Sequence, residues 1–255
     1  MSTMKPMIGS AIGAVMGRRK VRRRQTITDE QVLAHEIRTP LSLIQGAAEL
    51  LADEDDEGKR RRLVGTIQTN SARAIQIAES LLLQAKLHNG TYTLQKQAVD
   101  VRALLRETAQ EMRAISQVPI VVDDPGDPLS VEADPQLLRH ALWNVLNNAA
   151  RYAGGDHDIV VHSEASATKV IITVADFGPG MSTKQRKQLF VPFSQFTTRD
   201  DSQRVPTGAG LGMVIMADIV GRHGGEVLVD SSADHGTSVL MTLPKGTMTG
   251  GKGGE

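Results

Sequence analysis

The sequence predicts an α+β protein, in which an N-terminal helical hairpin is followed by an α/β sandwich. Three observations support this prediction. Two segments carry apolar residues at helical spacing, and short apolar strands alternate with helices from about residue 91 onward. The chain is 40% hydrophobic but only 3% aromatic, so its core must be built from aliphatic side chains and methionine. A length of 255 residues is enough for one large domain or two small ones.

The hairpin is predicted from two apolar seams with spacings of three and four residues. The first seam comprises Leu33, Ile37, Leu41, Ile44, Ala48 and Leu51, and the second comprises Leu63, Ile67, Asn70, Ala74, Ile77 and Leu81. The acidic stretch at residues 53–58 between them, which ends in glycine, is predicted to form the turn. Two narrow seams bury too little surface for a lone hairpin, so we expect a homodimer that forms a four-helix bundle. Asn70 either fixes the register of this bundle or is a tolerated polar residue.

The second half of the chain predicts a sheet covered by helices. Strands are expected at residues 92–99, 118–122, 129–132, 158–163, 169–175, 226–230 and 238–243, and helices at residues 101–116, 135–152 and 213–223. Asp134 and Pro135 are the N-cap and first residue expected of the helix that begins there. The predicted domains are a hairpin over residues 27–89 and a sandwich over residues 90–244. Residues 1–26 form a separate N-terminal segment, and residues 245–255 form a disordered tail.

Composition and charge exclude several functions. Without cysteine there are no disulfides or thiolate metal sites, which suits a cytoplasmic protein. The net charge is zero and no uniformly basic face is visible, so direct binding of nucleic acid is not expected. Residues 1–28 hold seven basic and no acidic residues, but the apolar run at residues 7–17 is too short to span a bilayer. Residues 7–24 are either a frayed terminus, a weak contact with the inner membrane surface, or the remnant of a membrane segment.

The first candidate site is the run of residues 35–40. His35 lies about 200° around the helix from Leu33, which points the imidazole away from the seam and into solvent. A neutral imidazole is a good phosphoryl acceptor, and Glu36 can take its proton during attack. Thr39 lies one turn further on, where its hydroxyl could position a water molecule. Pro40 removes a helical hydrogen bond and should kink the helix.

Polar residues on the helix after Pro135 form the second candidate site. Asn144 and Asn148 share a face at spacing four, and an amide oxygen is a suitable ligand for Mg²⁺, so Asn148 is the candidate metal ligand. Arg151 lies a further turn along the helix and could meet a phosphate, with Tyr152 beside it.

Glycine-rich segments follow. Asp176, at the end of an apolar strand, can accept a hydrogen bond from an exocyclic amine such as that of adenine, and Gly178 and Gly180 let the backbone approach a flat ring. The loop that contains Gly208, Gly210, Leu211 and Gly212 opens a helix and can bind phosphate through its backbone amides. Residues 190–207, with phenylalanines at 190, 193 and 196, predict a mobile lid over a nucleotide.

Taken together, these segments resemble the H, N, G1, F and G2 boxes of two-component sensor histidine kinases. The matching runs are His-Glu-Ile-Arg-Thr-Pro at residues 35–40, Leu-Asn-Asn-Ala-Ala-Arg-Tyr at 146–152, Asp-Phe-Gly-Pro-Gly at 176–180, Phe-Val-Pro-Phe at 190–193 and Gly-Ala-Gly-Leu-Gly at 208–212. The resemblance implies a dimerisation and phosphotransfer hairpin followed by a Bergerat-type ATP-binding domain. It also implies Mg²⁺-ATP, a response-regulator receiver domain as partner, and often phosphatase activity toward that partner.

The resemblance also assigns roles to single residues. It implies that His35 is phosphorylated, that Glu36 is its acid/base partner, and that Thr39 serves in dephosphorylation of the regulator. Thr237 resembles the last threonine on the nucleotide side of these domains. Two alternatives are a Bergerat-fold ATPase and a non-catalytic scaffold. The ATPase requires a glutamate at the position of Asn144 to activate water, and the scaffold does not need the nucleotide boxes that this chain retains.

Overall fold

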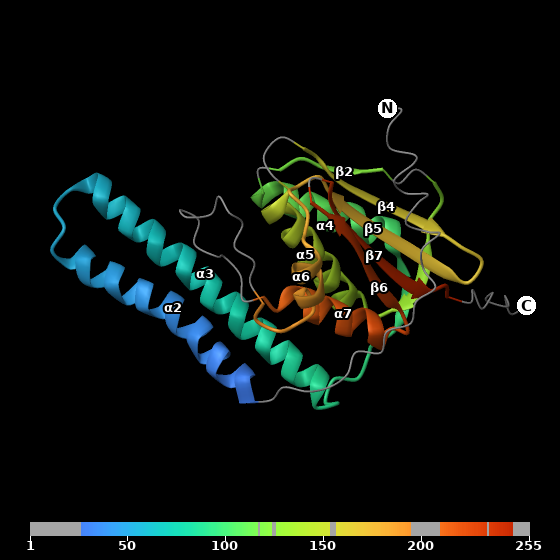
Figure 1. The fold of residues 1–255 in the computed structure, drawn as a ribbon, viewed down its shortest axis with the longest axis horizontal. Helices are drawn as coiled ribbons and strands as arrows, with labels where there is room; N and C mark the ends of the chain where they lie inside the picture. Colours follow the sequence, from blue (N-terminus) through green and yellow to red (C-terminus); the bar gives the residue numbers. More distant parts are fainter. Residues whose placement is uncertain are drawn as a thin grey trace, which may run out of the picture.

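The computed structural model describes residues 27–246 except 117, 124–125, 154–156, 195–209 and 234, with side chains from residue 34 onward. A helical hairpin projects from one side of an α/β sandwich (Figure 1). The predicted α+β architecture is confirmed within these residues. The N-terminal segment and the C-terminal tail of the prediction lie outside them.

The hairpin consists of α2 (Ile27–Ala52) and α3 (Glu57–His88). Asp56 caps α3 by accepting a hydrogen bond from the Lys59 amide at 2.8 Å, which ends the turn between the helices. Pro40 lies inside α2 and is buried. Asn70 is 8% exposed, and its side-chain amide donates to the Thr66 carbonyl at 2.8 Å within the same helix. This local hydrogen bond explains how a polar residue is accommodated in the seam, and it leaves both interpretations of Asn70 open.

The two predicted seams are covered to different extents. All members of the seam on α3 are buried or half-buried, as predicted. On α2, Ile37 and Ile44 are half-buried, but Leu41 is 51% exposed and Ala48 is also exposed. A single chain therefore leaves part of the α2 seam uncovered.

The sandwich is built on a five-stranded sheet in the order β2-β4-β5-β7-β6. The strands are β2 (Ile120–Val122), β4 (Ile159–Ala165), β5 (Lys169–Asp176), β6 (Glu226–Ser232) and β7 (Gly236–Pro244). β2 pairs with β4 in parallel, and the other three pairings are antiparallel. The helices α4 (Val101–Ile115), α5 (Pro135–Tyr152) and α7 (Gly212–Arg222) lie together on one face of this sheet (Figure 1).

Helix α5 begins and ends at the predicted residues, 135 and 152. The Asp134 carboxylate accepts from the amides of Gln136 and Leu137, both at 3.1 Å, and Pro135 occupies the first turn. The face of α5 that packs on the sheet is apolar, with Leu138, Leu142 and Leu146 each 0% exposed. This helix carries the polar stripe that the sequence singled out.

Two local predictions differ from the structure. The strand expected at residues 92–99 is restricted to β1 (Gln97–Asp100), which pairs only with β3 (Ser130–Ala133). Before it, the Tyr92 hydroxyl and the Gln95 amide both donate to Oδ2 of Asp134 at 3.0 Å, which holds this segment to the start of α5. The region predicted as loop contains a short helix, α6 (Thr183–Gln188), which begins with a capping box between Ser182 and Gln185.

Candidate functional site

Asp176 occupies the last position of β5 and faces the covering helices. Burial alternates along β5, so that Asp176 shares the buried face with Val170, Ile172 and Val174. The side chain is 6% exposed, and its Oδ1 accepts from the amides of Gly178 at 3.0 Å and Thr237 at 3.2 Å. Burial raises the pKa of Asp176, although both hydrogen bonds oppose the change. The sheet therefore holds a buried carboxyl group with its second oxygen available.

Helix α5 supplies the polar wall of the site. Asn147 and Asn148 lie three and four positions after Asn144, and Arg151 lies four and three positions after them, so the four residues form one stripe. Asn144 is only 7% exposed, and its Nδ2 has no hydrogen-bond partner among the described residues. The guanidinium of Arg151 lies over the ring of Tyr152, 5.4 Å from its centroid.

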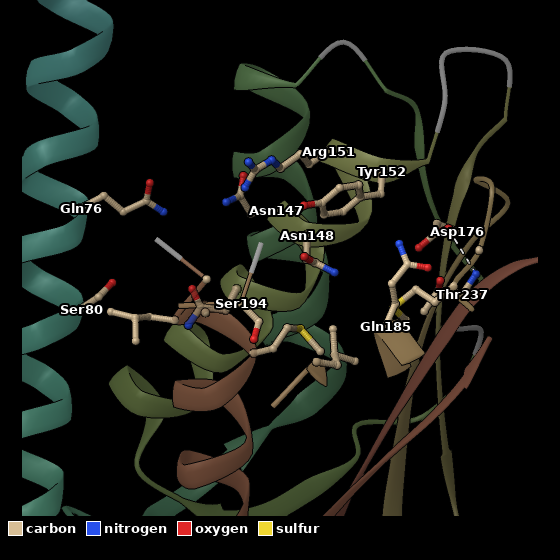
Figure 2. Close-up of a pocket in the computed structure, with 18 of the residues that line it drawn as sticks. Gln76, Ser80, Asn147, Asn148, Arg151, Tyr152, Asp176, Gln185, Ser194 and Thr237 are labelled. Atoms are coloured by element: carbon tan, nitrogen blue, oxygen red, sulfur yellow. Dashed lines mark hydrogen bonds between the residues drawn. The ribbon is translucent and has the colours of Figure 1, made fainter. Parts of the chain in front are cut away.

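These residues line a single pocket between the sheet, α5, the start of α7 and the hairpin helix α3. Its lining residues are Arg73, Gln76, Ile77, Ser80, Asn144, Asn147, Asn148, Arg151, Tyr152, Asp176, Pro179, Gly180, Met181, Gln185, Leu189, Ser194, Gly210, Leu211, Gly212, Met213 and Thr237. Figure 2 shows Asp176 and Thr237 at one end and Gln76 and Ser80 of α3 at the other. The α5 stripe lies between the two ends.

The glycines predicted for this site fit close approaches of the backbone. At Gly180, φ is +66°, and a Cβ there would overlap the carbonyl oxygen of Ser232. A Cβ at Gly178 would overlap the carbonyl oxygen of Tyr152. Neither position can therefore accept a side chain without movement of the backbone. Gly178 is not among the residues that line the pocket.

The phosphate-binding loop is described only in part. Gly210, Leu211 and Gly212 line the pocket at the start of α7, whereas Gly208 lies outside the described residues. Phe190 and Phe193 are partly buried against the core, and the Phe193 amide donates to the Gly210 carbonyl at 3.2 Å. That hydrogen bond joins two residues of the described chain that flank residues 195–209. The predicted lid and Phe196 fall within that segment, outside the described residues.

The second group of predicted residues lies on α2 of the hairpin. His35 is exposed, as predicted from its position opposite the seam. The Thr39 hydroxyl donates to the His35 carbonyl at 3.0 Å. Glu36 pairs with Arg73 of α3 at 3.4 Å, where both side chains are largely buried. None of His35, Glu36 and Thr39 lines the pocket.

The contribution of α3 to the pocket was not predicted. Its four lining residues, Arg73, Gln76, Ile77 and Ser80, have the spacing i, i+3, i+4 and i+7, which places them on one helix face. The sequence analysis assigned Ile77 to the hairpin seam. A second face at helical spacing, rich in polar residues, was the signal that could have revealed a contact with the sandwich.

Two features bear on metals and membranes. Among the described residues, no group of three or more His, Cys, Asp or Glu side chains could hold a metal ion. Within the same residues, no helix has the length and apolar character needed to cross a bilayer.

Comparison with family models identifies both parts of the chain. Residues 31–90 match the His Kinase A (phospho-acceptor) domain. Residues 133–247 match the histidine kinase-, DNA gyrase B-, and HSP90-like ATPase domain. The first match contains the H box, and the second contains the pocket residues of α5, the sheet and α7.

Curated relatives are sensor kinases that are longer than this chain. It is 28% identical to the sensor protein KdpD of Escherichia coli, over 84% of this chain and 24% of KdpD. It is 30% identical to the sensor histidine kinase ZraS of Escherichia coli, over 93% of this chain and 52% of ZraS. The chain thus spans about a quarter of the length of KdpD and about half that of ZraS.

Solved structures share the arrangement of hairpin and sandwich. The histidine kinase AdeS of Acinetobacter baumannii superposes with a TM-score of 0.64 at 20% identity, over 84% of this chain and 98% of AdeS, which shows the fold. Full-length ShkA in complex with AMPPNP has a TM-score of 0.63 at 26% identity, over 86% of this chain and 46% of ShkA. With a phospho-acceptor domain followed by an ATPase domain, the chain belongs to the sensor histidine kinases.

Proposed function

We propose that this chain transfers the γ-phosphate of ATP to His35 and then to an aspartate of a response-regulator receiver domain. The observation that carries the proposal is a pocket with a buried carboxyl group at one end, adjoining a hairpin that exposes a histidine. The histidine lies in the phospho-acceptor match, and the pocket lies mostly in the ATPase match. The AMPPNP complex of ShkA, a structure with the same fold, supports a nucleotide as the ligand.

The nucleotide is proposed to lie along the pocket with adenine at Asp176. Oδ2 of Asp176 accepts from the exocyclic amine, while Gly178 and Gly180 keep the backbone close to the ring and Thr237 closes this end. Backbone amides at Gly208, Gly210, Leu211 and Gly212 bind phosphates at the start of α7, where the helix dipole favours negative charge. Arg151 adds a positive charge beside the phosphates, with Tyr152 next to it.

The α5 stripe also fits the Mg²⁺ ion that accompanies ATP. The side-chain amide of Asn144 is nearly buried with an unpartnered Nδ2, and Asn148 lies one turn further along the pocket. We propose that Asn148 holds the ion through its amide oxygen, with Asn144 beside it. One or two protein oxygens suffice because Mg²⁺ keeps several waters and binds phosphate oxygens. When bound, the ion neutralises charge on the triphosphate.

At the acceptor site, a ring nitrogen of His35 forms a bond to the γ-phosphorus, and the bond between that phosphorus and the bridging oxygen of ADP breaks. Glu36 takes the proton that the imidazole releases. Positioning and charge neutralisation supply most of the rate enhancement. The hydroxyl of Thr39, already oriented by its hydrogen bond to the His35 carbonyl, can accept a hydrogen bond from the water that later dephosphorylates the regulator.

The proposed homodimer explains the apolar surface of the hairpin. On α3, Val64, Ile75 and Leu82 are 40%, 59% and 62% exposed, and their spacings of 11 and seven residues place them on one stripe. Leu41 of the α2 seam is 51% exposed. Soluble proteins rarely leave such a stripe uncovered, so we propose that a second copy completes a four-helix bundle.

The receiver partner is proposed from the same fold. The histidine kinase ThkA, solved in complex with the response regulator TrrA, superposes on this chain with a TM-score of 0.64 at 24% identity. Because ATP and receiver domains are cytoplasmic, we place the reaction in the cytoplasm. Residues 7–24 are proposed as a weak contact with the inner membrane surface through their basic side chains.

Labelled ATP tests the proposal. Purified protein is incubated with γ-labelled Mg²⁺-ATP, and the label on the protein is followed after acid and alkali treatment. We expect acid-labile, alkali-stable label that is lost in His35→Gln and retained in His88→Gln, a matched change of an exposed histidine on α3. Release of phosphate without labelled protein would favour an ATPase, against which the asparagine at position 144 argues. Failure to bind ATP would favour a scaffold.

A further inference from the structure

Arg73 connects the H box with the nucleotide pocket. Its Nη2 lies 3.4 Å from Oε2 of Glu36, the neighbour of the acceptor histidine, and the same side chain lines the pocket. Arg73 is 9% exposed, and its buried Nε has no hydrogen-bond partner among the described residues. A nearly buried cation with an unused Nε donor therefore lies between the two sites.

The guanidinium is poorly satisfied by Glu36 alone. Arginine presents five N–H donors in a rigid fork, which matches two oxygens of a phosphate or carboxylate. A contact of 3.4 Å through one nitrogen is longer than the roughly 2.7–2.9 Å of a good charge-assisted hydrogen bond. Burying a charge without full compensation is costly. Arg73 can therefore form stronger hydrogen bonds with another anion than it forms with Glu36.

The orientation proposed for the nucleotide in the pocket indicates which anion would pair with Arg73. Asp176 lies at the end proposed for adenine, and α3 forms the opposite end (Figure 2). At that opposite end, the α3 residues that line the pocket beside Arg73 are neutral, namely Gln76, Ile77 and Ser80. A nucleotide with its base at Asp176 extends its last phosphate toward α3, which supplies the positive charge of Arg73.

We propose that Arg73 binds the terminal phosphate of ATP and exchanges its pairing with Glu36 for this contact. The inference rests on the proposed function and adds a nucleotide-sensing residue supplied by the hairpin. ADP lacks the γ-phosphate, so Arg73 keeps its ion pair with Glu36 when ADP is bound. Arg73 then distinguishes ATP from ADP, and its exchange releases the Glu36 carboxylate from this ion pair when a phosphate donor is bound.

Nucleotide affinities test this proposal. Calorimetric titrations with Mg²⁺ compare AMPPNP and ADP for the wild type, Arg73→Gln, Arg73→Lys and the control Arg61→Gln, an exposed arginine of the same helix. We expect Arg73→Gln to weaken AMPPNP binding by about tenfold to a hundredfold, the size of a lost charge-assisted hydrogen bond, with ADP affinity nearly unchanged. Arg73→Lys should recover part of the loss, and Arg61→Gln should bind both ligands as the wild type does.

The remaining outcomes separate this inference from the proposed function. Equal weakening of both nucleotides in Arg73→Gln, or of neither, refutes the role of Arg73 while the proposed function stands. Absence of any nucleotide binding by the wild type instead removes the proposed function and the inference with it.

Glu36→Gln supplies a second test that does not depend on removing Arg73. Without its competing carboxylate, Arg73 should bind AMPPNP severalfold more tightly, with no change for ADP. Unchanged or weaker AMPPNP binding in Glu36→Gln overturns the exchange. In the double variant Glu36→Gln/Arg73→Gln, which removes both charges of this ion pair, the AMPPNP defect must persist. Recovery to wild-type affinity would show that the single variant failed for structural reasons.

Discussion

Replacing Asp176 with asparagine separates the structural role of its carboxylate from its proposed role in binding adenine. In the structure, Gly178 and Thr237 both donate to Oδ1, at 3.0 and 3.2 Å. The amide oxygen of asparagine can keep both hydrogen bonds. Oδ2, however, becomes an NH₂ group. Because the exocyclic amine of adenine is itself a donor, the substitution places one donor opposite another.

The expected loss of affinity follows from that lost contact. A hydrogen bond to a charged group is worth about 1.5–3 kcal/mol, so Asp176→Asn should weaken ATP binding by about tenfold to a hundredfold. The folded protein should behave differently. Burial raises the pKa of Asp176, which means that the ionised carboxylate is held at a cost in stability. Asparagine removes that cost, so Asp176→Asn should be at least as stable as the wild type at neutral pH.

The pH dependence gives the sign of this effect. A carboxyl group whose folded pKa is raised favours folding at low pH, and that contribution is lost as pH rises from its ordinary range, about 3.9, through the raised value. The stability advantage of Asp176→Asn should therefore be present at pH 7 and shrink in acid, where Asp176 is protonated. Asp176→Ala is the contrasting variant. It leaves two buried backbone amides without an acceptor, at about 1–3 kcal/mol each.

Two measurements test the structural role and the proposed adenine-binding role of Asp176. Thermal unfolding across the pH range compares the three proteins, and calorimetry measures their affinities for ATP. If Asp176→Asn binds ATP as tightly as the wild type, Asp176 is not the adenine acceptor. If Asp176→Asn is as unstable as Asp176→Ala at neutral pH, the account of the two Oδ1 hydrogen bonds is wrong.

Three further predictions concern other parts of the chain. Ile75→Asp combined with Leu82→Asp places charges on the exposed stripe of α3 and should convert the proposed dimer into monomers in light scattering, without loss of helix content in circular dichroism. Gly180→Ala, at φ +66° and against the Ser232 carbonyl, should cost more than about 1 kcal/mol in urea unfolding and weaken nucleotide binding. Burial alone would raise the pKa of Asp134, but four hydrogen bonds outweigh it and lower the pKa. The stability that this carboxylate contributes is present above about pH 4 and lost as pH falls through its lowered pKa, so Asp134→Asn should be less stable than the wild type at neutral pH and equal to it in strong acid.

The features that the sequence predicted well depend on local physical chemistry. Asp134 and Pro135 set the start of α5 because capping and the fixed φ of proline act within one helical turn. Asp176 lies at the end of β5 as predicted, because the apolar run before it forms the strand, and the alternation of burial along β5 places its side chain on the buried face. His35 is exposed because its position relative to the seam is fixed by helical periodicity.

The features that were missed depend on contacts between distant segments. Tyr92 and Gln95 read as strand residues, but hydrogen bonds to Asp134, about 40 positions later, hold them outside the sheet. Arg73 was not singled out in the sequence because its two neighbours, Glu36 and the nucleotide pocket, belong to other elements. No local pattern specifies which face of a hairpin a following domain will cover.

The packing of α3 against the sandwich bears on how phosphotransfer is controlled. Ile77 and Leu87 are each 1% exposed within the main apolar core, and Arg222 of α7 donates to the Leu87 carbonyl. This arrangement directs the phosphate end of the pocket to Arg73 and not to His35, which lies outside the pocket. The proposed transfer to His35 within one chain therefore requires the sandwich to leave Ile77.

Exposing a fully buried isoleucine costs about 1.5–3 kcal/mol, or about tenfold to a hundredfold in population. Coupling energies between distant sites in proteins have the same size, about 1–3 kcal/mol. A signal that shifts or rotates α3 by a small amount can therefore balance the cost of releasing Ile77. Control of the proposed kinase then acts through the packing of α3, which also forms one wall of the nucleotide pocket.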